Sequence, residues 1–378
     1  MKQKLLLVSD TFHPQVDGTV IFLDEFLRRA KDSFDISVLV PRFTEKSSHT
    51  PPSVSYLDIS SILKPLPAYP SIKISFKNLR KIQQAVHDAD IVFIQGPALA
   101  SFLAMYYGHR YGKRTVAYTH VLSWELFEKS ASPLLGIFTP LLKKMCLFFY
   151  NYCDEVLVPY QELKERLQRE GMHCPITVAR LGVDITRFSP STDKRLRKRA
   201  LGISNSAFVV GYVGRISPEK NVQVLRKAFL RLVNAGENVH LLLVGDGAPE
   251  QREEFNSLPR CTVTGFVHNV QDYLKAMDVF VMPSLTETTS LATLEAMSCG
   301  VPVIVTKVGF MKKYVTRDYN GLFFPKGDAS TLATKIEKLR QDKTLRERFG
   351  SNARKTVAYS FSWERSINKI RRLLQKGL

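Results

Sequence analysis

The sequence predicts an α/β protein built from two doubly wound domains. The chain has 378 residues, more than a single compact core usually holds. Continuous apolar runs bounded by turn residues alternate with helix-like segments along its length, a pattern typical of parallel strands buried on both faces of a sheet. Hydrophobic residues make up 44% of the chain, which excludes a disordered protein.

The first series of expected strands begins at the N-terminus with KLLLVSD (4–10), followed by the helix-like segment VIFLDEFLRRAKD. The apolar stretch of this first run is too short for a signal peptide, so we interpret it as a strand. The later strands of the series are ISVLVP (36–41), DIVFIQG (90–96), RTVAYTH (114–120) and EVLVPY (155–160).

A second series starts near residue 207, with the strands FVVGYVG, VHLLLVGDG, CTVTGF, VFVMPS and VPVIVT. Between the two series, LGVDITRFSPST (181–192) has no sustained period and carries turn residues, so we expect it to link the domains. The basic amphipathic segment at the C-terminus could pack back onto the first domain or lie free. Ligands are expected in the cleft between the domains, at the C-terminal ends of strands.

The net charge of +19 indicates a polyanionic partner, which could be nucleic acid, anionic lipid or a phosphorylated substrate. No RNA- or DNA-binding motif accompanies this charge, so nucleic acid is disfavoured. The five cysteines form no C-x-x-C pair and indicate reduced, buried thiols in a cytosolic protein. The most apolar stretch, LLGIFTPLLKKMCLFF, is interrupted by Lys143 and Lys144 and is no candidate for a membrane span.

Two basic side chains follow the first strand of the second domain. Arg215 and Lys220 lie five residues apart in YVGRISPEKN, where a loop leaves the C-terminal end of the strand. Arginine offers a fork of donors to phosphate oxygens and lysine a point charge, although a solvated basic loop would look the same. In the first domain, Gly18 follows the first strand and would let the backbone approach a phosphate or a sugar.

Two glutamates, Glu287 and Glu295, flank the start of an apolar helix in TETTSLATLEAM. Acidic and hydroxyl residues favour a first helical turn, because unpaired N–H groups and the positive end of the helix dipole lie there. Those N–H groups, near Thr289, Ser290 and Leu291, can instead bind the phosphate of a ligand. A carboxylate can accept two hydroxyl hydrogen bonds, which fits a sugar or ribose diol.

Taken together, GRISPEKN, LLLVGDG, GFV, DVFVMPSLTETTSLATLEAMSCGVPVI and NGLFF resemble glycosyltransferase family 4 over residues 205–330, and SDTFHPQVDGT and YTH match it more loosely. The resemblance implies a GT-B fold, meaning two Rossmann-like domains with a cleft between them, and retention of anomeric configuration. The resemblance also implies that residues 1–182, joined by a helix at 361–378 that crosses back, bind the acceptor and that residues 183–360 bind the nucleotide sugar.

The resemblance also implies a role for each matching residue. Arg215 and Lys220 would hold the diphosphate of the donor. Glu295 would bind the ribose, and Glu287 the transferred hexose. His120, which closes YTH, would lie near the reacting centre, although by itself it fits a satisfied histidine at a strand end. The implied catalytic residues are His120, Arg215, Lys220 and Glu287, and the implied donor-binding residues are Gly18, Arg215, Lys220, Glu287, Thr289, Ser290, Leu291 and Glu295.

One departure from the family concerns donor choice. Glycine usually follows the first glutamate, whereas this chain has Thr288, Thr289 and Ser290. Backbone N–H groups can still bind the diphosphate, but the sugar contacts change. Family members are thought to react on the leaving-group face of the donor, where the departing diphosphate takes the acceptor proton and cationic groups stabilise its charge.

We expect no metal and no other cofactor. Asp88-Ala89-Asp90 is a literal D-x-D sequence, which holds a divalent ion in transferases of another fold. Here it lies at the start of a strand rather than at its C-terminal end. We therefore interpret it as a polar connection between a helix and a strand.

The first domain has a basic, apolar surface that favours a lipid-linked acceptor. Residues 71–87 place the basic side chains of Lys73, Lys77, Arg80 and Lys81 among apolar residues. Residues 134–149 put Phe138, Leu141, Leu142, Met145 and Phe149 at helical spacing. Either apolar face could instead pack on the sheet, and for 134–149 packing is the preferred interpretation.

The sequence therefore predicts a cytoplasmic hexosyltransferase attached peripherally to the inner face of the cell membrane. We expect it to move glucose from UDP-glucose to a lipid or glycolipid. The alternatives are a soluble sugar or polysaccharide acceptor, and a non-catalytic protein that binds anionic lipid or nucleic acid. A dinucleotide-dependent oxidoreductase is disfavoured, because the first loop lacks G-x-G-x-x-G.

Overall fold

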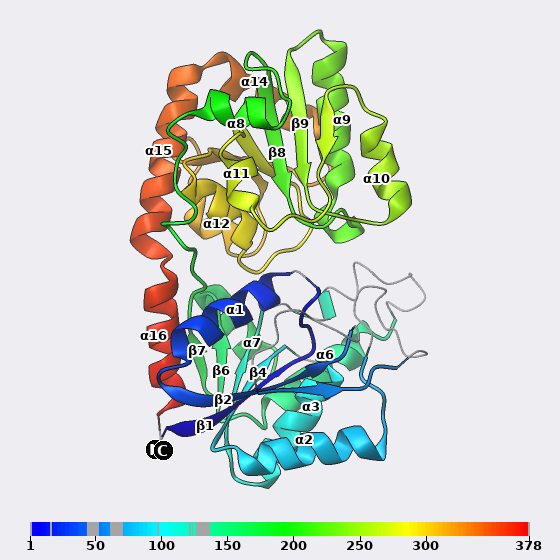
Figure 1. Cartoon of the computed structure of the whole chain (residues 1–378), viewed down its shortest axis with the longest axis vertical. Coiled ribbons are helices and arrows are strands. Elements are labelled where there is room, and N and C mark those ends of the chain that lie inside the picture. The colour runs from blue at the N-terminus through cyan, green and yellow to red at the C-terminus, as the bar shows by residue number, and fades with distance from the viewer. Residues whose placement is uncertain are drawn as a thin grey trace. The chain divides into compact units, whose positions relative to one another are not determined.

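The computed structural model describes residues 2–15, 17–43, 53–60, 71–96, 98–120, 122, 124–125 and 137–376. The chain divides into two compact units, Met1–Leu181 with Trp363–Leu378, and Gly182–Ser362. Each unit contains a parallel sheet with helices packed on it (Figure 1). The predicted α/β class with two doubly wound sheets is confirmed.

The first unit is built on a seven-stranded parallel sheet in the order β3-β2-β1-β4-β5-β6-β7. The strand order reverses between β1 and β4, so the crevice at their C-terminal ends is the usual ligand position in such a sheet. Its strands are β1 (Gln3–Ser9), β2 (Phe34–Pro41), β3 (Val54–Leu57), β4 (Ile91–Gln95), β5 (Arg114–Tyr118), β6 (Glu155–Val158) and β7 (Ile176–Val178).

Six helices in the described residues accompany this sheet. Phe26 of the first helix packs on Phe93 of β4 with ring centroids 5.1 Å apart. The last helix packs on the first, where Trp363 lies 6.1 Å from Phe22 between ring centroids. The helices are α1 (Gly18–Ala30), α2 (Phe76–Asp88), α3 (Leu99–Arg110), α6 (Thr139–Tyr150), α7 (Gln161–Arg169) and α16 (Trp363–Leu374). The C-terminal segment thus returns to the first unit as a helix.

The second unit has a six-stranded parallel sheet in the order β10-β9-β8-β11-β12-β13, which reverses between β8 and β11. Its strands are β8 (Phe208–Val213), β9 (Val239–Val244), β10 (Cys261–Val263), β11 (Val279–Met282), β12 (Val303–Thr306) and β13 (Gly321–Phe324). Its helices are α8 (Lys194–Ala200), the 3-10 turn η1 (Pro218–Lys220), α9 (Val222–Asn234), α10 (Pro249–Asn256), α11 (Val270–Leu274), α12 (Leu291–Ser298), α13 (Met311–Tyr314), α14 (Ala329–Gln341) and α15 (Lys343–Ser360).

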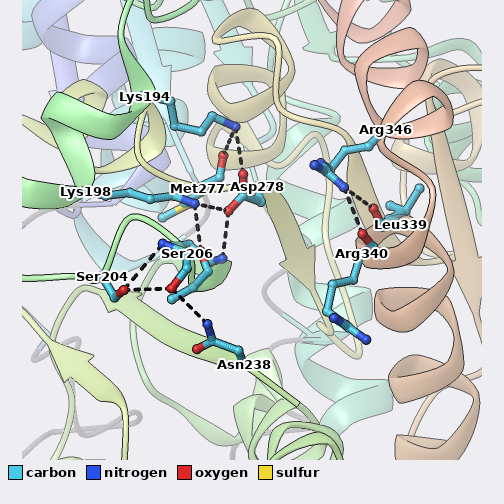
Figure 2. Close-up of polar contacts among 12 residues, drawn as sticks. Lys194, Lys198, Ser204, Ser206, Asn238, Met277, Asp278, Leu339, Arg340 and Arg346 are labelled. Atoms are coloured by element: carbon cyan, nitrogen blue, oxygen red, sulfur yellow. Dashed lines mark hydrogen bonds and ion pairs between the residues drawn. The ribbon is translucent and has the colours of Figure 1, made fainter.

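A cluster of charged side chains around the buried Asp278 fastens α8 to this sheet (Figure 2). Lys198 Nζ donates to Asp278 Oδ2 at 2.6 Å, and Lys194 Nζ donates to Asp278 Oδ1 at 3.3 Å. The N–H of Val209 on β8 donates to the same carboxylate at 2.9 Å. Burial pushes the pKa of Asp278 upward, but the two lysines and the hydrogen bonds hold it below its ordinary value. The cluster fixes the segment that enters the second sheet.

In the part of the chain that the structure describes, no helix is long and apolar enough to cross a membrane. All five cysteines are free thiols; Cys146, Cys153 and Cys299 are buried, whereas Cys174 and Cys261 are only half-buried. Both aspartates of the D-x-D sequence serve local structure, since Asp88 accepts from Gln84 Nε2 at 2.9 Å and Asp90 from the N–H of Lys4 at 2.8 Å.

Candidate functional site

The loop between β11 and α12 brings two predicted site residues together. Glu287 Oε1 accepts from Lys220 Nζ at 2.5 Å and from Ser284 Oγ at 2.9 Å. The side chains of Lys220 and Glu287 are only 21% and 9% exposed. The two opposite charges compensate each other in this half-buried position, because either one alone would be costly where water is largely excluded.

Beside Arg215 lies the carboxylate of Glu219, which the sequence analysis did not single out. Glu219 is buried; its Oε1 lies 3.6 Å from Arg215 Nη2 and accepts from Ser217 Oγ at 2.7 Å. Its carbonyl accepts from the N–H of Leu285 at 2.9 Å, which ties the β8 loop to the β11 loop. The available signal was its position between two basic residues, four after Arg215.

Residues of α13 and just before it contact the backbone carbonyls of the β11–α12 loop. The N–H of Phe310 donates to the Thr288 carbonyl at 2.7 Å, and Tyr314 Oη donates to the Thr289 carbonyl at 2.6 Å. Gly309 has φ +52°, and a Cβ there would lie 2.0 Å from the carbonyl oxygen of Glu287. Only glycine therefore fits beneath this loop. No short motif in the sequence indicated these contacts.

The N-terminus of α12 has no side-chain cap. Ser290 occupies the N-cap position with φ +61°, a left-handed conformation that is uncommon outside glycine, and makes no capping hydrogen bond. Its Oγ pairs with Thr293 Oγ1 at 2.8 Å instead. Thr289 Oγ1 is buried and has no hydrogen-bond partner among the described residues. Leu291, the first helical residue, is also buried. The hydroxyl cluster thus leaves the N–H groups of this helix available to an anion.

Glu295 lies in the second turn of α12, in a different electrostatic setting from Glu287. Burial raises its pKa to about 7, and the positive charge of Arg187 offsets part of this effect. Arg187 comes from the segment after residue 182, where Nη2 donates to the His268 carbonyl at 2.7 Å and Nε to Gln271 Oε1 at 3.1 Å. The sequence analysis did not single out Arg187.

His120 and Gly18 belong to the first unit. The imidazole of His120 is buried, with its ring centroid 4.4 Å from Tyr118 and 4.8 Å from Phe22, and its Nε2 lies 2.7 Å from Gln95 Oε1. Burial lowers the pKa of His120 to about 3, so the ring is neutral at physiological pH. Gly18 begins α1, directly after the capping residue Asp17.

The four basic residues of the 71–87 segment do not act as one cluster. Lys77 Nζ pairs with Asp58 at 2.9 Å, and Lys81 Nζ donates to the Tyr56 carbonyl at 2.9 Å. Lys73 and Arg80 are exposed.

For the 134–149 segment, of which residues 134–136 lie outside the described part, we expected the apolar face to pack on the sheet. This expectation is wrong at three positions. Phe138, Leu141 and Met145 point to solvent, with 55%, 66% and 39% exposure.

Comparison with known proteins identifies the family and the fold of this chain. The family model "Glycosyltransferase Family 4" matches residues 16–187, and "Glycosyl transferases group 1" matches residues 193–356. The chain belongs to this glycosyltransferase family. The GT-B fold is confirmed by similarity to the structure of HepE from Anabaena in complex with UDP and glucose, with TM-score 0.78, 20% identity, and coverage of 99% and 100% of the two chains.

Two curated relatives illustrate the range of the family. A GDP-mannose-dependent alpha-mannosyltransferase of Mycobacterium tuberculosis is 27% identical over 86% of this chain and 84% of its own. A UDP-Gal:alpha-D-GlcNAc-diphosphoundecaprenol alpha-1,3-galactosyltransferase of Escherichia coli is 30% identical over 52% of this chain and 53% of its own. The chain spans about half the length of several curated relatives that it matches at 30% identity or more.

Proposed function

We propose that this chain is a retaining hexosyltransferase that moves a sugar from a nucleoside diphosphate donor to a lipid or glycolipid acceptor at a membrane surface. The observation that supports this best is the start of α12, where uncapped N–H groups adjoin the Lys220–Glu287 pair. A diphosphate suits such a place, because it brings negative charge to both the helix N-terminus and the lysine.

In the proposed complex, Lys220 and Glu287 exchange their contact with each other for contacts with the donor. A donor that offers phosphate oxygens to Lys220 and sugar hydroxyls to Glu287 keeps both charges compensated. Glu219 keeps Arg215 beside the same loop. Glu295 would accept the ribose hydroxyls in its ionised form. In this assignment the residues bind and orient the donor, and no carboxylate acts as a nucleophile.

The proposed reaction breaks the bond between the anomeric carbon and the phosphate oxygen, while the acceptor oxygen bonds to that carbon on the same face. The acceptor proton moves to the departing diphosphate. Arg215, Lys220 and the α12 N-terminus stabilise the negative charge that develops there. His120, neutral because it is buried, would contribute hydrogen bonding to the sugar rather than a positive charge.

We propose UDP-glucose as donor. The solved HepE complex contains UDP and glucose, and the name of the Escherichia coli relative gives UDP-galactose, but that of the mycobacterial relative gives GDP-mannose. The replacement of glycine by Thr288, Thr289 and Ser290 is where the sugar choice would arise. A membrane-surface acceptor agrees with the diphosphoundecaprenol-linked substrate in the name of the Escherichia coli relative.

A thermal-shift experiment tests the donor site without knowledge of the acceptor. We expect UDP to raise the Tm of the full chain, and Glu295→Ala to abolish this rise. Glu347→Ala, at a side chain that is 66% exposed, is the matched control and should keep it. The proposal fails if no nucleoside diphosphate raises the Tm. Hydrolysis of a panel of nucleotide sugars then identifies the sugar.

Two further assays test the remaining parts. Among the described residues, no group of three or more His, Cys, Asp or Glu side chains could hold a metal ion. We propose metal-independent transfer that continues in EDTA.

An acceptor assay tests the membrane part of the proposal. Transfer to diacylglycerol in vesicles should exceed transfer to free glucose. Faster transfer to the soluble sugar would replace the lipid acceptor with a soluble one and leave the donor assignment intact.

A further inference from the structure

Helix α6 and the two residues that precede it expose an apolar stripe in the first unit. The exposed side chains are Ile137, Phe138, Leu141, Met145 and Phe148, with exposures of 76%, 55%, 66%, 39% and 57%. The spacing from Phe138 onward is three, four and three residues, which places these side chains on one side of a helix. We call these five side chains the α6 face.

The opposite side of α6 is apolar as well. The helix is buried in the core of the unit through Cys146, Leu147 and Tyr150. The core contact of α6 therefore does not involve the α6 face. The polar side chains of the helix are few, and one of them, Lys143, pairs with Glu170 at 3.1 Å. A helix on the surface of a water-soluble protein normally has polar residues on its outer side, so the α6 face is built for an apolar environment.

The surroundings of the α6 face are aromatic and basic. Phe148 packs edge-on against Tyr152 with ring centroids 5.1 Å apart, and Tyr152 lies 6.4 Å from the 44%-exposed Tyr106 of α3. Of the basic residues in the segments 99–114 and 137–152, Lys143 and Arg114 are paired with Glu170 and Glu155. Arg110, Lys113 and Lys144 remain for an anionic surface. Tyrosines with a polar tip and basic side chains beside an apolar stripe are the features that bind the headgroup region of an anionic bilayer.

We propose that the α6 face inserts into the interfacial layer of an anionic lipid bilayer and is the principal membrane-binding surface of this chain. Arg110, Lys113 and Lys144, which lie in the segments 99–114 and 137–152 with the apolar stripe, favour lipid phosphates as the occupant, because basic residues next to an apolar stripe complement an anionic bilayer surface. The basic residues of α2 are then secondary, because Lys77 and Lys81 are already engaged with Asp58 and Tyr56. The inference deepens the proposed function by locating the surface that would meet a lipid acceptor.

The test is sedimentation of the full chain with phosphatidylcholine vesicles, with and without phosphatidylglycerol, at low salt. We expect binding to the anionic vesicles and a fall in the partition constant of about tenfold in the double variant Leu141→Gln/Phe148→Gln, because two apolar side chains no longer leave water. Leu196→Gln is the matched control, since Leu196 is a 56%-exposed leucine on helix α8 of the other unit. It should bind as the unchanged chain does.

Three results would overturn the proposal: no binding of the unchanged chain, equal binding of the double variant, or an equal loss in Leu196→Gln. Gel filtration adds a fourth, because a dimer that the double variant abolishes would make a second copy of the chain the occupant of the α6 face. The UDP-induced rise in Tm is measured on the same variants. It should persist in both, which separates failure of membrane binding from failure of the donor site and shows that the variants are folded.

Discussion

Two helix starts in this molecule, those of α1 and α12, follow strands in the same way but treat their N–H groups differently. At α1, Asp17 caps the helix, and its carboxylate accepts from the N–H groups of Thr19 and Val20 at 2.9 and 3.0 Å. At α12, the N-cap residue Ser290 makes no such bond. A capped start gains helix stability, whereas an uncapped start keeps its donors for a ligand.

The two loops are also held by different means. The α1 loop is held by its own side chains, because Thr11 Oγ1 donates to Asp17 Oδ2 at 3.1 Å. The α12 loop is held through its carbonyls by Phe310 and Tyr314, which lie on a separate segment. This arrangement fixes the loop from its carbonyl side, so its amides need not be used for internal contacts. From this comparison we propose anion binding at the start of α12 and a structural role for the N–H groups of Thr19 and Val20 at the start of α1.

The largest effect that would break this comparison is expected from Lys220→Ala. The change removes a charge proposed to stabilise the leaving diphosphate and leaves the half-buried Glu287 without its cationic partner. We expect kcat/KM for the donor to fall by about 10²- to 10³-fold. Lys343→Ala, at a 75%-exposed side chain, serves as the control. Steady-state rates of donor hydrolysis measure both, and a fall below about threefold would remove Lys220 from the site.

Gly309→Ala tests the support beneath the α12 loop. A methyl group there would meet the Glu287 carbonyl at 2.0 Å, so the loop must move. We expect a loss of about 2–4 kcal/mol in the free energy of unfolding, together with weaker UDP binding. Gly327→Ala is a matched control, because Gly327 has φ +78° but open space around its Cβ position. It should lose only about 1 kcal/mol and bind UDP normally. Equal losses in the two variants would mean that backbone strain, and not the loop contact, is responsible.

The pKa of Glu295, in the second turn of α12, predicts that the free energy of unfolding depends on pH. The folded-state pKa of about 7 is above the ordinary value of 4.5. Folding therefore favours the neutral form of Glu295. Its contribution to the free energy of unfolding is fully present below about pH 4.5 and is lost as the pH rises through about 7. The full difference is roughly 3 kcal/mol. Urea unfolding between pH 5 and 8 should show this decline in the unchanged chain and a smaller one in Glu295→Gln.

The affinity for the donor should depend on pH in the opposite direction to the free energy of unfolding. Ribose hydroxyls donate to the ionised carboxylate, so UDP affinity should rise between pH 6 and 8, by up to about tenfold. Isothermal titration at three pH values measures this. A UDP affinity that changes with pH equally in the unchanged chain and in Glu295→Gln would contradict the assignment of Glu295.

The smallest expected effect concerns the capped helix. Asp17→Ala removes the α1 cap and should lower the free energy of unfolding by about 1 kcal/mol. Because the N–H groups of Thr19 and Val20 are assigned a structural role, UDP affinity should change by less than about threefold, or about 0.7 kcal/mol. A large loss of UDP affinity with intact folding would make the start of α1 part of the donor site.

The fold and part of the site could be predicted because they depend on local patterns. Buried parallel strands appear as apolar runs, and the residues after them, such as Lys220 and Glu287, meet where strands end at one edge of a sheet. The support from Gly309 and Tyr314 could not be predicted, since it joins residues about twenty positions apart through carbonyl contacts that leave no motif. The orientation of α6 was predicted wrongly because both of its sides are apolar, so periodicity could not indicate which side faces the core.

The central claim is that the N–H groups of α12, rather than those of α1, bind the donor diphosphate. Amide chemical shifts of the isotopically labelled full chain, recorded with and without UDP, test it most directly. The claim predicts the largest changes at the amides of Thr289, Ser290 and Leu291, with small changes at Thr19 and Val20. Large changes at Thr19 and Val20 with none at the start of α12 would contradict it.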